Sequence, residues 1–276
     1  MTEVETAPRR TPPRLLQVLS ATRVTPRMLR VTLGGADMAG FPEGSDGSHI
    51  KVFLPLAGQD RPVLPTLGPK GPVWPPRDQR PITRTYTVRR HHAGRGELEI
   101  DFVLHDDAGP ASSWAAAAKP GNFIGLAGPA GPDRVIRDAD WHVMAGDMSA
   151  LPAIAAALES LPAAARGHAF IEVPDAGERQ RIDTASQVTI HWLHRDEAGN
   201  DRADLLEQAV RAMPWPDGTL SATIAGESGA VVAIRDYLRR ERGLDRNAIY
   251  AVPYWKASLT EEGYHEERHR IMDTMD

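Results

Sequence analysis

The stretch HEERH, residues 265–269, has the residue types and the spacing of a zinc site. His265 and His269 lie four residues apart, so a helix would put both on one face, with Glu266 beside them as a general base. After His269, Asp273 is the one candidate for a third ligand in helical register. The surrounding segment is polar on nearly every face, which is typical of a solvated terminal helix. We therefore expect no metal site, and the functional chemistry must come from the rest of the chain.

Three other segments combine a turn with a helix start, where an anion can bind. AGDMSALPA (145–153) and AGES (225–228) each follow an apolar strand, so that free backbone N–H groups of a helix would point at an anion such as phosphate. HDDAGPASSWAAAA (105–118) would do the same, with Ser112 and Ser113 in the first helical turn. None of the three is the glycine-rich dinucleotide fingerprint, so an ordinary strand-to-helix turn stays open as an interpretation of each.

The segment RTYT, residues 84–87, could hold a flavin nucleotide. On a strand, Arg84 and Tyr86 share one face, and Thr85 and Thr87 lie on the other. An arginine binds a phosphate through two N–H groups, a tyrosine ring offers a stacking surface, and a hydroxyl can bond to a heteroaromatic nitrogen. The same pattern is also common on half-exposed barrel strands, so the four residues alone leave both interpretations open.

The first half of the chain consists of short apolar runs. From residue 14 to about 130 they are separated by Gly, Pro or charged turns, which is typical of β-strands. In ELEIDFVLH (97–105) apolar and mostly polar residues alternate cleanly. Many short strands at regular spacing favour an antiparallel barrel or sandwich. The proline-rich stretch 62–81 predicts a long surface loop, because proline removes the donors that a central strand or a helix needs.

The second half predicts strands alternating with helices, and hence a parallel sheet with crossover connections. Ser149 is expected to cap the first helix. The predicted strands are 141–146, 168–173, 188–193, 219–226 and 248–255, and the predicted helices are 149–161, 202–213 and 230–241. We therefore predict a disordered N-terminus over 1–12, an all-β domain over 13–136 and an α/β domain over 137–276.

The composition excludes several classes of function. The chain has 276 residues and a net charge of -5, with a pI near 6.1, which argues against a nucleic-acid or membrane-surface partner. It has no cysteine, so any redox chemistry must reside in a bound cofactor. No signal-like segment and no run of about 18 apolar residues occurs, which predicts a cytoplasmic protein. No long apolar stripe is apparent, so we expect a monomer.

Several segments together, in chain order, resemble those of the siderophore-interacting proteins, which are ferric-siderophore reductases of the ferredoxin reductase superfamily. The segments are RTYTVRR, DFVLH, GPASSWA, GPAGP, AGDMSALPAIAAALE, AGE and YWKASLTEEGYHEE. The resemblance runs from about residue 13 to 269, and the last segment is its most specific element. It implies a six-stranded antiparallel FAD-binding barrel, a nicotinamide-binding domain with a parallel sheet, and a C-terminal helix in which zinc has no role.

The resemblance also implies roles for individual residues. Arg84 would meet the FAD pyrophosphate, Tyr86 would pack on the isoalloxazine, and Thr87, with Thr85 beside it, would lie near flavin N5. The other implied FAD contacts are Asp101, Val103, His105, Ala111, Ser112 and Ser113. The residues implied to border NADPH or NADH are Gly146, Asp147, Ser149, Gly226 and Glu227. Trp255 would shield the flavin face or form interdomain core. Family members usually carry an acidic residue where this chain has Met148.

The implied reaction passes electrons from NADH or NADPH through FAD to ferric iron in a siderophore, which holds Fe(II) far more weakly and releases it. Catecholate ferric siderophores are polyanionic, so a cationic docking surface is expected. The candidates for it are Lys51, Arg89, Arg90 and Lys256, of which Lys256 is favoured because it follows Trp255. Arg179 and Arg181 are available for the 2′-phosphate of NADPH.

Three alternatives remain at this stage. The chain could be a general NAD(P)H:flavin or ferric reductase that serves another electron acceptor. It could also be a non-catalytic flavin- or siderophore-binding carrier, since Met148 alters the loop that the resemblance assigns to nicotinamide. A metallohydrolase built on HEERH is a third, and it would need stoichiometric zinc.

Overall fold

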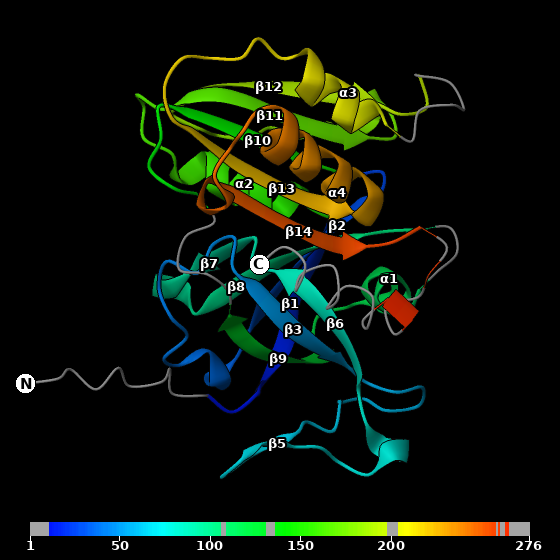
Figure 1. The fold of residues 1–276 in the computed structure, drawn as a ribbon. Helices are drawn as coiled ribbons and strands as arrows, with labels where there is room; N and C mark the ends of the chain where they lie inside the picture. The colour runs from blue at the N-terminus through cyan, green and yellow to red at the C-terminus, as the bar shows by residue number, and fades with distance from the viewer. Residues whose placement is uncertain are drawn as a thin grey trace, which may run out of the picture. The chain divides into compact units, whose positions relative to one another are not determined.

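The computed structural model describes residues 11–105, 109–130, 136–197, 204–257, 259, 263 and 264. The HEERH stretch and Asp273 lie outside these described residues, as do residues 1–10 of the N-terminus that was predicted to be disordered over 1–12. Of the predicted C-terminal helix, Gly263 and Tyr264 are described, and both are helical. The chain forms two compact units, whose elements are labelled in Figure 1. The first unit comprises Met1–Thr22, Arg30–Ile100 and Leu104–Gly131, and the second comprises Arg23–Leu29, Asp101–Val103 and Pro132–Asp276.

The first unit is built on a seven-stranded sheet with the order β6-β3-β9-β1-β2-β8-β7, which has a barrel-like form. Strand β9 pairs antiparallel with β1 and β3, β3 pairs with β6, and β7 pairs with β8. The elements are β1 (Arg14–Thr25), β2 (Met28–Gly34), β3 (His49–Leu54), β6 (Ile82–Thr87), β7 (Arg90–His92), β8 (Glu97–Val103), α1 (Pro110–Ala117) and β9 (Phe123–Ala130). This confirms the predicted antiparallel β domain.

The predicted number of six strands is wrong by one. The short strand β7 forms a hairpin with β8, because Gly96 at φ 60° closes the turn between them in a left-handed conformation that glycine adopts easily. The proline-rich segment contains a separate two-stranded sheet of β4 (Thr66–Gly68) and β5 (Gly71–Val73). As expected for so many prolines, it contributes no central strand.

The second unit contains a five-stranded parallel sheet with the order β12-β11-β10-β13-β14. Its elements are β10 (Trp141–Gly146), α2 (Leu151–Ser160), β11 (Arg166–Val173), β12 (Gln187–His194), α3 (Leu205–Ala212), β13 (Leu220–Glu227), α4 (Ser228–Asp236) and β14 (Ile249–Trp255). The chain moves outward from β10 in one direction and then returns to β13 on the other side. The carboxyl ends of β10 and β13 therefore flank the switch point where such sheets bind ligands.

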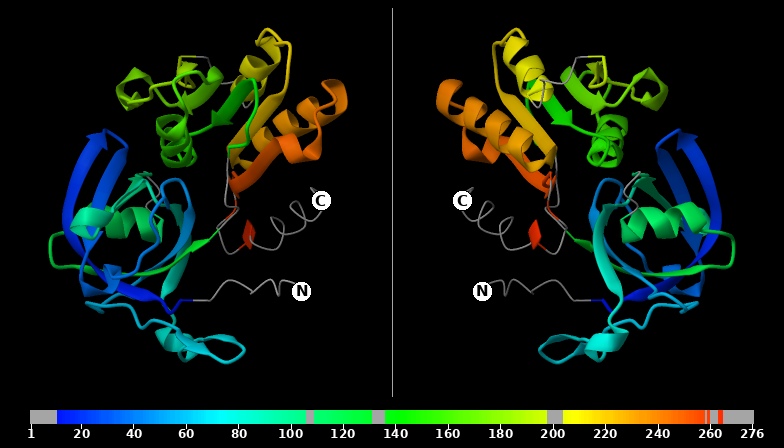
Figure 2. Two further views of the ribbon diagram at one scale, coloured as in Figure 1. Left: turned by 90° about the vertical axis from the view of Figure 1, so that its left-hand side faces the viewer. Right: turned by 90° about the vertical axis from the view of Figure 1, so that its right-hand side faces the viewer.

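The helices of the second unit cover both faces of its sheet, as Figure 2 shows. Helix α2 packs with Met144, Ala169 and Ile171 in one apolar cluster, while α3 and α4 pack with Val143 and Ala145 in another. Neighbouring residues of β10 point to opposite faces, and because both faces are covered the strand is buried from His142 to Gly146 and is apolar except at His142. This confirms the predicted α/β half.

Short turns complete the two units. They are the 3-10 turns Ala36–Met38, Arg77–Gln79, Ala93–Arg95, Ala176–Glu178 and Arg246–Ala248, and a π turn over Tyr237–Glu241 that continues α4. Among the helices in the described ranges, none is long and apolar enough to cross a membrane.

Candidate functional site

In the first unit, strand β6 carries the predicted flavin group Arg84 to Thr87. All four residues lie on the strand, and Thr87 is buried while the other three are half-buried. The antiparallel register places Lys51 of β3 opposite Thr85, and the Lys51 ammonium donates a 2.5 Å hydrogen bond to the Thr85 hydroxyl. Arg84 and Tyr86 share the other face of β6, as the alternation predicted. A cation, an aromatic ring and hydroxyl groups thus lie within one four-residue strand segment.

The start of helix α1 is the candidate phosphate site of the first unit. Gly109 occupies the cap position, and no side chain of the described residues caps this end. Ala111 and Ser112 are buried in the first turn, and the Ser112 hydroxyl accepts a 3.1 Å hydrogen bond from the backbone N–H of His105. This bond ties the end of β8 to the helix across residues 106–108. A helix start with spare N–H groups fits a phosphate, so the residues of this unit fit the FAD that the resemblance implies.

The remaining predicted FAD contacts are divided between the two units. His105 and Ser113 are both exposed, and both belong to the first unit, as does helix α1. Asp101, which is 4% exposed, and the half-buried Val103 belong to the second unit. The alternation predicted for β8 is confirmed at Leu98, Ile100 and Phe102, which are fully buried.

In the second unit, carboxylates of the chain itself accept hydrogen bonds from backbone N–H groups in the turn before α2 and at the start of α4. Asp147 Oδ1 accepts hydrogen bonds from the backbone N–H groups of Ser149 at 2.8 Å and Ala150 at 3.3 Å, in the turn that leads into α2. Glu227 Oε2 accepts from the N–H groups of Gly229 and Ala230, at 2.5 and 3.2 Å, at the start of α4. The expectation of free N–H groups is therefore wrong for α4, and in the loop before α2 the N–H groups of Ser149 and Ala150 are already bonded to Asp147. The expected cap at Ser149 is also wrong, because Ala150 is the cap residue of α2 and the Ser149 hydroxyl bonds to Asp147.

The glycine and the methionine of the first loop are explained by packing within the unit. A Cβ atom at Gly146 would lie 2.7 Å from the Ala225 carbonyl oxygen and 2.6 Å from the Ala150 Cβ, so only glycine fits there. Met148 is 7% exposed and belongs to the apolar cluster under α2. Its side chain therefore extends the core and leaves the polar groups of the loop as they are.

One acidic residue at this edge was missed by the sequence analysis. Glu172 lies at the end of β11 with 15% of its side chain exposed, and Arg195 approaches it at 3.5 Å. Burial raises the pKa of Glu172; Arg195 opposes the shift, and Asp147 and Glu227 add to it. The signal available in the sequence was a single charged residue within the apolar run FIEV. The carboxyl ends of three neighbouring strands thus each hold an acidic side chain.

The four cations predicted to dock a substrate lie in different settings. Lys51 is half-buried on β3, and Arg90 is half-buried on β7. Lys256 is half-buried directly after β14 in the second unit. Arg89 is only 5% exposed, so its guanidinium does not offer the open surface that the prediction required.

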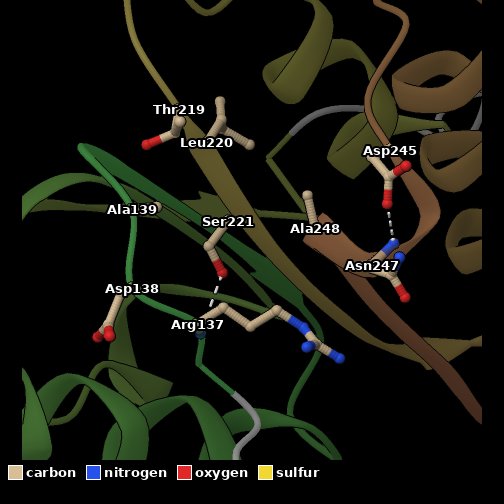
Figure 3. Close-up of a pocket in the computed structure, with 9 residues that line it drawn as sticks. All are labelled: Arg137, Asp138, Ala139, Thr219, Leu220, Ser221, Asp245, Asn247 and Ala248. Carbon is tan, nitrogen blue, oxygen red and sulfur yellow. Dashed lines mark hydrogen bonds between the residues drawn. The ribbon is translucent and has the colours of Figure 1, made fainter.

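The opposite edge of the parallel sheet has a cavity of about 300 Å³. Figure 3 shows that its lining comes from the segments that precede or begin β10, β13 and β14, with Arg137, Ser221 and Asn247 among the residues drawn. Because it lies at the amino ends of the strands, it is not the ligand site expected of this fold. Among the described residues, no group of three or more His, Asp or Glu side chains is placed to hold a metal ion.

Comparisons with known proteins agree with this arrangement. Residues 17–133 match the model of the siderophore-interacting FAD-binding domain, and residues 139–258 match that of the siderophore-interacting protein. Ferric vibriobactin reductase ViuB of Vibrio cholerae is 46% identical over 263 residues, which are 95% of this chain and 96% of that protein. The NADPH-dependent ferric-chelate reductase of Escherichia coli is 32% identical over 247 residues, 88% of this chain and 93% of that one.

A solved structure extends the agreement to three dimensions. The siderophore-interacting protein SipS from Aeromonas hydrophila is 39% identical and superposes with a TM-score of 0.81, over 95% of this chain and 98% of SipS. The fold, the order of the two matched domains and the identity over nearly the full length all point the same way. The chain belongs to the siderophore-interacting protein family.

Proposed function

We propose that this protein is an FAD-dependent reductase of ferric siderophores, which takes electrons from NADPH or NADH and releases Fe(II) in the cytoplasm. The observation that carries the proposal is the joining of an FAD-binding domain and a siderophore-interacting domain in one chain, at high identity to a named ferric reductase. Relatives of this length are named as reductases, so a non-catalytic carrier is not favoured. Bound FAD would supply the redox chemistry, since it accepts two electrons at once and can pass them on singly.

The FAD would be held by strand β6 and helix α1. Arg84 is the proposed ligand of the pyrophosphate, with the N–H groups at the start of α1, which no described side chain caps, as a second anion site. Tyr86 would pack on the flavin rings, and Thr85 and Thr87 would offer hydroxyls to the flavin. Asp101, Val103, His105 and the first turn of α1 remain proposed contacts on the ribityl and phosphate side.

The proposed contacts for the ferric siderophore are Lys51 and Arg90 in the first unit and, separately, Lys256 in the second unit. The Lys51 ammonium is hydrogen-bonded to the hydroxyl of Thr85. Thr85 lies between Arg84 and Tyr86 on β6, so the charge of Lys51 is close to both proposed FAD contacts. An anionic iron chelate would be attracted to such a charge, which raises its local concentration beside the flavin. Because one nicotinamide supplies two electrons, each turnover would reduce two ferric ions.

For the electron donor we favour NADPH, and Arg179 supports this choice. Its Nε donates a 2.9 Å hydrogen bond to Nε2 of His194, whose Nδ1 lies 2.8 Å from Glu197. Arg179 is therefore held in place by an imidazole, and no carboxylate of the described residues pairs with its guanidinium. Arg181, by contrast, pairs with Asp183 at 2.7 Å. An exposed arginine just beyond a parallel strand is suited to the 2′-phosphate that distinguishes NADPH from NADH.

Two measurements test the proposal. The purified protein should show a flavin absorption spectrum that bleaches under anaerobic conditions with NADPH or NADH and recovers when a ferric siderophore is added. A colourless protein that does not take up added FAD would refute the proposal that the protein binds a flavin. Arg84→Ala should weaken FAD binding about ten- to hundred-fold, since hydrogen bonds to charged groups contribute about 1.5 to 3 kcal/mol. Arg77→Ala, at an exposed arginine of the same unit, is the matched control.

Donor choice has its own test. Arg179→Gln should lower the ratio of kcat/KM for NADPH to that for NADH by about ten-fold or more, because one charge-assisted contact to the phosphate is lost. Arg181→Gln should leave the ratio within about two-fold, since exposed ion pairs contribute little. Equal effects of the two substitutions would rule out Arg179 as the phosphate ligand.

A further inference from the structure

The second oxygen of the Asp147 carboxylate joins two further elements of the second unit. Asp147 Oδ2 accepts a 2.8 Å hydrogen bond from the backbone N–H of Glu227 and a 2.7 Å bond from the indole N–H of Trp255. With the three bonds to Oδ1 from Ser149 and Ala150, this carboxylate accepts five hydrogen bonds. An ionised carboxylate has about four lone-pair sites, so Asp147 has no capacity left for a ligand.

The backbone of β13 is shaped to admit this carboxylate. Gly226 has φ 126°, and a Cβ atom there would lie 2.7 Å from Asp147 Oδ2. The pairing of β13 with β14 shifts register between Gly226 and Glu227, so that Glu227 comes to pair with Trp255. Glu227 in turn accepts a hydrogen bond from the Ala257 N–H at 3.3 Å, just beyond β14. The glycine of the AGE segment therefore makes room for Asp147.

We propose that Asp147 is a positioning residue for the nicotinamide reaction, and that it acts through Trp255. By accepting the indole N–H it fixes a ring that is 41% exposed, beside the switch point of the sheet. A ring fixed in this way offers a flat face on which the nicotinamide ring of the donor can stack in one orientation. This inference rests on the proposed function, because it assumes that NADPH or NADH binds at the carboxyl edge.

Two conservative substitutions isolate the hydrogen bond. Asp147→Asn keeps the shape, but it removes the negative charge and turns one of the two acceptor oxygens into a donor, so the five hydrogen bonds to Asp147 cannot all form and the bond from the Trp255 indole is weakened or lost. Trp255→Phe keeps an aromatic ring and removes the indole N–H. Asp183→Asn is the matched control, because Asp183 is an exposed aspartate of the same unit that pairs with Arg181.

The experiment combines a spectroscopic and a kinetic measurement on the FAD-loaded protein. In a ¹H–¹⁵N spectrum, the Trp255 indole signal is identified by its absence in Trp255→Phe. It should move upfield in Asp147→Asn and stay in place in Asp183→Asn. In anaerobic stopped-flow absorbance, the limiting rate of flavin reduction by NADPH should fall about ten-fold in both single variants, the effect of one charge-assisted hydrogen bond. The double variant should be no slower than either, because both remove the same interaction.

An indole signal that is unmoved in Asp147→Asn would overturn the inference, as would rate effects that multiply in the double variant. If Asp147→Asn does not fold, Trp255→Phe decides alone, since an unchanged limiting rate would show that the hydrogen bond positions nothing. If neither NADPH nor NADH reduces the flavin of the wild-type protein, the proposed function fails. The indole measurement would still report whether the hydrogen bond exists, so the two failures are distinguishable.

Discussion

Replacing Thr25 by valine tests the buried bond that fastens the segment after β11. The Thr25 hydroxyl donates to Oε2 of Glu178, both residues belong to the second unit, and Thr25 is 7% and Glu178 0% exposed. The other oxygen, Glu178 Oε1, has no hydrogen-bond partner among the described residues. Valine has nearly the shape of threonine, so Thr25→Val would leave a fully buried carboxylate without a donor in that part of the chain.

The expected loss is about 2 to 3 kcal/mol of unfolding free energy, because hydrogen bonds to charged groups contribute about 1.5 to 3 kcal/mol and the stranded carboxylate adds to this. With a urea slope of about 2 kcal/mol/M, the midpoint should fall by about 1 M. Thr25→Ser keeps the hydroxyl and should lose only about 1 kcal/mol for the missing methyl group. Thr189→Val, at an exposed threonine of β12, should stay within about 0.5 kcal/mol of wild type. If Thr25→Val is no less stable than Thr189→Val, the bond does not stabilise the unit.

Three other outcomes are expected. Gly146→Ala should lower the unfolding free energy by about 2 to 3 kcal/mol, since its Cβ would lie 2.7 Å from the Ala225 carbonyl oxygen; an unchanged urea midpoint would contradict this packing. Burial lowers the pKa of both His168 and His191, so protons bind more readily to the unfolded chain, and the unfolding free energy should fall as the pH drops below about 6.5. His191→Gln should make this fall less steep. Parallel curves of unfolding free energy against pH for the variant and the wild type would disprove the prediction. Lys51→Ala should raise the KM for a ferric siderophore about ten-fold and change the rate of flavin bleaching by NADPH much less; a larger effect on bleaching would remove Lys51 from the docking surface.

The fold could be predicted from the sequence because each half has one dominant periodicity. The strand 141–146 was predicted at its observed bounds, since it is a short apolar run between turn residues. The hairpin strand Arg90–His92 was not, because three polar residues carry no alternation and the strand exists only through pairing with β8. The helix predicted over 230–241 ends in a π turn, a change of hydrogen-bond register that residue type does not encode.

For the candidate site, the sequence predicted which residues lie at the carboxyl edge more reliably than it predicted what each of them does there. Asp147 and Glu227 were expected at the carboxyl edge and lie there, but Glu227 caps the start of α4 and Asp147 bonds to the turn before α2, where free N–H groups were expected. Which acceptor caps a helix depends on side-chain positions that are set by neighbouring strands, and Asp147 is held partly by Trp255, 108 residues away. Arg89 illustrates the same limit, because it is buried between β6 and β7 while its neighbour Arg90, the first residue of β7, is half-buried.

The second unit is assembled from three separate segments of the chain, and this limits how the protein can be divided by evolution or by engineering. The unit is not a continuous length of chain, since it includes Arg23–Leu29 and Asp101–Val103. A fragment that starts at residue 137 would lack Met28, which is fully buried in the cluster under α2, and would lose the donor to Glu178. A gene fusion or domain swap made at the boundary between the two matched domains would therefore separate residues that are packed as one core. A recombinant protein should fold well only when both matched domains come from the same parent protein.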